Sequence, residues 1–293
     1  MSTPPIDLMS LLALLINLLV LVSIGTCGFL VWRALGQSPW PAAHSRNLMP
    51  WPGWLLPATV ATWLSLSIFA MKPTPTTAAA AGADAVNAPI IHNSLMHLAL
   101  FGFLIALIEA ARHNANYYTT ETTPTGQRNW TWAWRNSTSN AQSLTRQLLY
   151  GIVGFLACLL PTLIVFQATL PFRPENLMHP LLKLIGEDKT GQVLITVTIS
   201  AVLVAPWVEE LMFRVILQRT LLNHLSPSFS ILLTALAFCT IHPSWQDAVG
   251  LAPLALVLGV TYHRTGSFLA VVVIHMLFNA FNILSMMIES AAV

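Results

Sequence analysis

Long apolar stretches constrain the fold of this chain more than any other feature of its sequence. The uncharged stretch from Leu8 to Trp32 is longer than the about 20 residues that a helix needs to cross the hydrocarbon core of a bilayer. Further candidate membrane segments cover 52–71, 89–111, 148–170, 192–222, 228–242, 247–262 and 267–288. The fold class that we predict is therefore all-α: a polytopic transmembrane helical bundle of about eight membrane segments.

Charge and organisation narrow the class further. Only 8% of the residues are charged, whereas a soluble domain carries about 25%. The net charge of +2 is too small to suggest a nucleic-acid partner. We expect an N-terminal half, residues 1–145, that contains transmembrane segments and a polar cytosolic loop of unknown role. Residues 146–293 form the second half, and all the motifs below lie in it.

One apolar stretch, WVEELMFRVILQ at 207–218, contains three ionisable residues. Pro206 precedes it and favours a kink or break in the helix just before the glutamates. Glu210 and Arg214 are four residues apart, so they share a helix face and can pair. Glu209 lies about 100° round the helix, without that partner. Burial disfavours the charged form of a carboxyl group, which makes Glu209 a candidate general base. The alternative is a charge cluster that only fixes the helix.

Two later stretches add polar groups with helical spacing. FCTIH places Phe238 and His242 four residues apart, and HMLFN does the same for His275 and Asn279. Each pair shares one face of its helix. Pro243 predicts that His242 lies at the end of its helix.

Together these side chains could support the attack of water on a carbonyl group. Glu209 would take the proton from the water molecule, and His242 would help to hold it. His275 and Asn279 would donate hydrogen bonds to the developing oxyanion.

The motifs EELMFR, FCTIH and HMLFN follow one another in an apolar setting, as EExxxR, FxxxH and HxxxN. In this order they resemble the CPBP family (CAAX proteases and bacteriocin-processing enzymes) of glutamate-type intramembrane proteases, related to type II CAAX prenyl endopeptidases. The resemblance covers about residues 146–290, so we expect residues 146–293 to form a CPBP-like intramembrane protease core. It implies peptide-bond hydrolysis at a membrane-embedded site, with the catalytic residues Glu209, His242, His275 and Asn279 and the supporting residues Glu210, Arg214 and Phe238.

The resemblance also implies partners and a location. We expect no cofactor and no metal site, contact with membrane lipids, and a membrane-associated or lipidated protein or peptide as substrate. We expect an integral membrane protein of the bacterial cytoplasmic membrane.

Three alternatives stay open. The first is a zinc-dependent membrane peptidase that uses Glu209, His242 and also His275, although the HExxH motif of zincins is absent. The second is a proton-coupled transporter, in which buried Glu and His residues pass protons, although no repeated half is visible. The third is a non-catalytic membrane scaffold that keeps the fold.

Overall fold

The computed structural model describes residues 8–35, 51–70, 83–114, 143–172, 191–242 and 245–292. Throughout these ranges the regular structure is helical, and they contain no strand. The predicted all-α membrane bundle is therefore confirmed. Most of the predicted polar cytosolic loop lies outside the described residues.

Each predicted segment corresponds to a helix. The structure contains α1 (Leu8–Leu35), α2 (Leu55–Ala70), α3 (Ala83–Asn114), α4 (Leu144–Thr169) with a short η1 (Leu170–Phe172), α9 (Pro227–Thr240), α10 (Trp245–Thr265) and α11 (Phe268–Ala292). The fifth segment is one long helix of five parts: α6 (Gln192–Thr198), η2 (Ile199–Val204), α7 (Ala205–Glu210), η3 (Leu211–Gln218) and α8 (Arg219–Leu222).

Five of the described helices are long and apolar enough to cross a membrane. They span Leu8–Ala34, Ile90–Ala111, Leu144–Phe172, Gln192–Leu222 and Phe268–Ile288. The shorter apolar helices Leu55–Ser65 and Pro227–Thr240 fall below that length. The bundle therefore has five full-length candidate spans among its described residues, where the sequence predicted about eight membrane segments.

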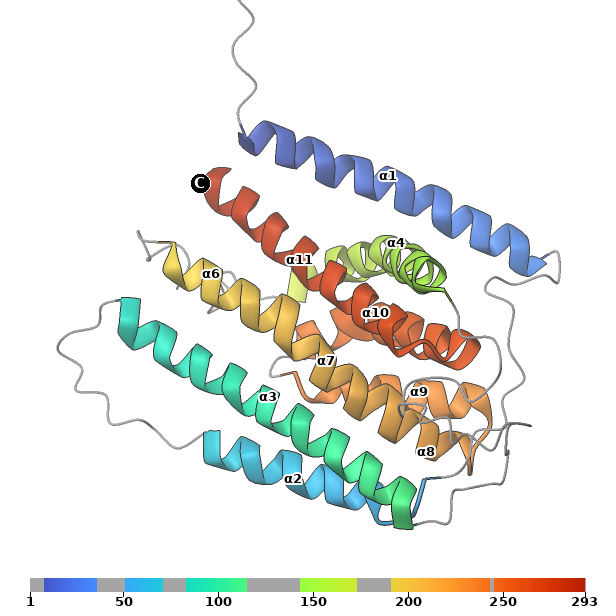
Figure 1. Cartoon of the computed structure of the whole chain (residues 1–293). Helices are drawn as coiled ribbons and strands as arrows, with labels where there is room; N and C mark the ends of the chain where they lie inside the picture. The colour runs from blue at the N-terminus through green and yellow to red at the C-terminus, as the bar shows by residue number, and fades with distance from the viewer. Residues whose placement is uncertain are drawn as a thin grey trace, which may run out of the picture.

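The long helix from α6 to α8 lies inside the bundle (Figure 1). Helix α3 packs on one side of it and α11 on the other. Helix α2 packs against α3, whereas α1 packs against α4 at the far side of α11. The helices that precede residue 145 thus flank the remaining helices on two outer sides.

Two glycines allow α4 and α11 to approach closely. A Cβ atom at Gly151 would lie 2.5 Å from Val273 Cγ1 and 2.7 Å from its Cβ. A Cβ atom at Gly154 would clash with Ile274 in the same way. Small residues at helix crossings are how membrane helices gain close van der Waals contact.

A proline in α4 leaves a backbone carbonyl without its helical donor, and a side chain of α1 donates to this carbonyl. Pro161 has no N–H to donate to Ala157 O, four residues earlier. Cys27 Sγ of α1 donates to this oxygen at 3.6 Å. One turn away, Ser23 Oγ donates to Leu156 O at 2.6 Å and accepts from the Leu160 N–H at 2.9 Å. Because no backbone group in hydrocarbon can rely on water, these contacts attach α1 to α4.

The long helix widens on both sides of the glutamates. The flanking segments η2 and η3 are π-helical, a form that is often found at functional sites. At the end of η2 the Ala205 N–H donates to Ser200 O, five residues back. The next residue, Pro206, has no N–H for the next acceptor, Ala201 O. The kink or break predicted at Pro206 is thus a change of helical register, and the helix continues through it.

The close contact of α4 with α11 can be tested at Gly151. We expect Gly151→Leu to lower the free energy of unfolding by about 1–3 kcal/mol, as overpacking does. Thermal unfolding in detergent measures the change. The control is Gly102→Leu, since nothing lies within 4 Å of a Cβ atom at Gly102. Equal stability of the Gly151 variant and the wild type would contradict the close approach.

Candidate active site

The two neighbouring glutamates lie in different surroundings. Both belong to α7, the short α-helical stretch between the two π segments. The Glu210 side chain is fully buried, whereas 19% of the Glu209 side chain is exposed. Glu209 is therefore the glutamate of the pair whose side chain is partly exposed, while its Oε2, the oxygen nearest to His275, is buried.

Glu210 and Arg214 form the ion pair that their spacing predicts. Arg214 Nε lies 3.1 Å from Glu210 Oε2, and both side chains are fully buried. The Arg214 Cζ atom also lies 5.1 Å from the centre of the Phe238 ring. Nη1 and Nη2 of this guanidinium have no hydrogen-bond partner within the described structure. Glu210 is thus the group that compensates most of this buried charge.

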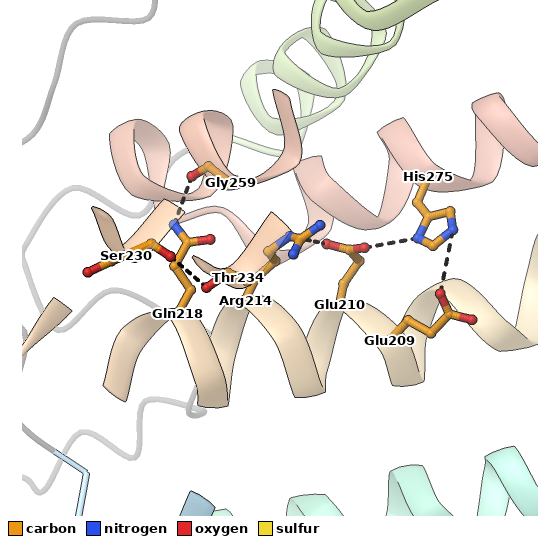
Figure 2. Close-up of polar contacts among 8 residues, drawn as sticks. All are labelled: Glu209, Glu210, Arg214, Gln218, Ser230, Thr234, Gly259 and His275. Atoms are coloured by element: carbon orange, nitrogen blue, oxygen red, sulfur yellow. Dashed lines mark hydrogen bonds and ion pairs between the residues drawn. The ribbon is translucent and has the colours of Figure 1, made fainter. Parts of the chain in front are cut away.

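His275 joins the two glutamates (Figure 2). Its Nδ1 lies 2.9 Å from Glu210 Oε1, and its Nε2 lies 3.8 Å from Glu209 Oε2. The ring is only 3% exposed. A carboxylate can only accept, so Nδ1 donates to Glu210 and Nε2 points toward Glu209. The four-residue spacing predicts only Arg214 as a partner of Glu210. The structure shows that His275 is a second partner of Glu210.

Phe238 separates the two histidines. This fully buried ring lies 5.6 Å from the His275 ring and 5.2 Å from the His242 ring, between centroids. Its edge-on contact with Phe213 brings it against the glutamate-bearing helix. Phe238 therefore sets how far apart the histidines can lie.

His242 lies just beyond the end of α9, as the following proline predicts. Its Nδ1 lies 3.0 Å from Phe238 O, and a carbonyl only accepts, so Nδ1 carries the proton of this bond. Nε2 of a neutral His242 is then an acceptor. The side chain is half-buried, which leaves this nitrogen a suitable group to hold water.

Asn279 lies one turn after His275 on α11. Its Nδ2 donates to Ala201 O at 2.7 Å, the acceptor for which Pro206 provides no backbone donor. The contact ties α11 to η2. One N–H of the amide group is thereby used, so the predicted oxyanion contact would need the other.

The sequence motifs did not include Gln218, which extends the row of buried polar side chains formed by Glu210 and Arg214. Gln218 follows Arg214 by four residues and is fully buried. Its Nε2 donates to Gly259 O of α10 at 2.8 Å (Figure 2). A Cβ atom at Gly259 would lie 2.9 Å from Ile231 Cγ2, so a small residue is needed there. The four-residue spacing Glu210–Arg214–Gln218 is the sequence signal that could have revealed it.

The zinc peptidase alternative requires a cluster of metal ligands. Nowhere in the described ranges, which include Glu209, His242 and His275, do three or more His, Cys, Asp or Glu residues form a group that could hold a metal ion.

Comparison with known protein families finds a similarity in this region. Residues 191–281 match the family model described as Type II CAAX prenyl endopeptidase Rce1-like. No curated protein and no solved structure matches the chain significantly. The predicted resemblance is confirmed, over a range that is shorter than the predicted 146–290 but includes all of the site residues described above.

The buried pair yields a stability prediction. We expect Glu210→Gln to lower the free energy of unfolding by about 3–5 kcal/mol, because it leaves the buried Arg214 charge without a counter-charge. Glu209→Gln, the same change one residue earlier and partly exposed, should unfold like the wild type. Thermal unfolding of both variants in detergent provides the comparison.

A double variant provides the control. Glu210→Gln/Arg214→Leu removes both charges and should regain part of the lost stability. If Glu210→Gln alone unfolds like Glu209→Gln, the ion pair does not stabilise the fold.

Proposed function

Because residues 191–281 match the family model described as Type II CAAX prenyl endopeptidase Rce1-like, we propose that this integral membrane protein is an intramembrane endopeptidase. In this proposal Glu209 activates the water molecule that hydrolyses a peptide bond. The substrate would be a membrane-associated or lipidated protein or peptide, reached among membrane lipids. A location in the bacterial cytoplasmic membrane belongs to the same proposal and rests on the resemblance.

The position of Glu209 beside His275 is the observation that supports this function best. Glu209 is the partly exposed carboxylate in a network whose other members, His275, Glu210 and Arg214, are buried. An ionisable network of this kind within apolar helices is costly and typical of a functional site. Its one partly exposed side chain, that of Glu209, carries a carboxylate, the group that a general base requires.

In the proposed hydrolysis, Glu209 first accepts a proton and later returns it. Glu209 takes a proton from water, and the resulting hydroxide attacks the carbonyl carbon of the scissile bond. The carbonyl oxygen becomes an oxyanion in the tetrahedral intermediate. When the C–N bond breaks, Glu209 returns the proton to the leaving amine. No covalent enzyme intermediate is formed.

Donors for the oxyanion would come from α11. With Nδ1 donating to Glu210, a doubly protonated His275 would also carry a proton on Nε2. Nε2–H would then donate to the oxyanion. The amide N–H of Asn279 that Ala201 leaves free would be the second donor, and His242 Nε2 would hold the attacking water.

The general-base role predicts the effect of one variant. We expect Glu209→Gln to lower kcat by about 10²–10⁴-fold, the usual contribution of general base catalysis, because an amide cannot take the proton. Cleavage of quenched membrane and lipidated peptides by purified protein in liposomes measures it. Glu109→Gln, the same change on α3, is the control. Wild-type activity in Glu209→Gln would contradict the assignment.

Metal dependence has its own test. If Glu209 and the two histidines act without a metal ion, activity in the same assay will persist after prolonged treatment with a strong chelator. Loss of activity that added Zn²⁺ restores would favour the zinc peptidase instead.

A further inference from the structure

Trp51 connects the N-terminal half of the chain to the helix that bears the glutamates. Its indole Nε1–H donates to Val215 O at 2.8 Å, across 164 positions of sequence. Only 8% of the tryptophan is exposed, and it lies far outside the matched range 191–281. Buried indole N–H groups usually have a hydrogen-bond partner, and here that partner is a backbone oxygen of η3.

The acceptor lies where the helical register changes. Val215 is fully buried in the last turn of η3, and the wide helix ends three residues later. At that end the Arg219 N–H donates to Ile216 O, three residues back. Where a π segment ends, the hydrogen-bond spacing becomes shorter than five residues, so one backbone carbonyl receives no backbone N–H. That carbonyl then needs another donor. A donor at Val215 O therefore favours the wide form of the helix.

A second contact fixes the indole ring. The Arg219 Cζ atom lies 4.4 Å from the ring centre of Trp51, within the range of a cation–π interaction. Arg219 follows Val215 by four residues, so both contacts fall on one face of the long helix. Trp51 thus contacts two successive turns of this helix.

We propose that Trp51 is a positioning residue for the peptidase reaction, which presumes the proposed function. Val215 directly follows Arg214, the partner of Glu210. By holding the end of η3, Trp51 fixes the place of Arg214 and thereby of the Glu210–His275 contact. A displacement of about 1 Å in a catalytic group can cost about a hundredfold in rate.

The test distinguishes the contribution of the Trp51 indole N–H from the contribution of its ring. Trp51→Phe removes the donor, and the benzothiophene isostere of tryptophan at position 51 replaces the N–H with sulfur while keeping the shape. We expect both to lower kcat about tenfold per folded molecule with KM within about twofold, because positioning acts on the reaction more than on binding. The control is Trp54→Phe, since Trp54 is 41% exposed.

Three results would overturn the proposal in this assay. The first is an unchanged kcat in both Trp51 variants. The second is an equal loss of kcat in Trp54→Phe. The third is a loss of folded protein with normal kcat in the molecules that remain folded, which would make Trp51 a stabilising residue only.

Nuclear magnetic resonance tests the geometry without any activity. We expect the Trp51 indole N–H to exchange with solvent more slowly than that of Trp54, and the isostere at position 51 to shift the ring signals of His275. Equal exchange rates, or unmoved His275 signals, would overturn the proposal. If the wild type cleaves no peptide while these two signals behave as expected, the proposed function fails and the positioning contact stands.

Discussion

A backbone carbonyl that loses its helical partner inside a bilayer has no water to replace it, and this constraint decides how the helices of this protein are joined. Pro161 frees such a group in α4, and Ser23 and Cys27 of α1 cover that turn. Pro206 supplies no donor in the long helix, and Asn279 of α11 provides one. The irregular turns are therefore the points where neighbouring helices attach.

The same low-dielectric setting makes the charges depend on one another. Glu210 lies between Arg214 and His275, so one carboxylate compensates a guanidinium and orients an imidazole. Beyond the imidazole lies Glu209, the one member of the network with a partly exposed side chain. The chain of groups therefore runs from a fully buried cation to a glutamate whose side chain is partly exposed, the residue proposed above as the general base.

Sequence patterns predicted those features that depend on local spacing. Long apolar runs located the helices, and the four-residue spacing located the ion pair of Glu210 with Arg214. The bond from His275 to Glu210 was not predictable in this way, because it joins residues 65 positions apart on separate helices. Nothing local specifies which of two adjacent glutamates accepts the hydrogen bond of His275, and the π segments change the angles that an ideal helix would give. The partner of Trp51 was hidden for the same reason.

The contacts between helices determine which parts of the chain would have to be transferred to another protein together with the glutamate-bearing helix. The matched range, residues 191–281, includes the whole network from Arg214 to Glu209. Yet Val215 O accepts its hydrogen bond from Trp51, which lies outside that range. A chimaera that carried only the matched helices would expose this oxygen to lipid. The smallest unit in which the glutamate-bearing helix could be transplanted with its contacts is thus larger than the matched range, because it also includes Trp51 from the N-terminal half.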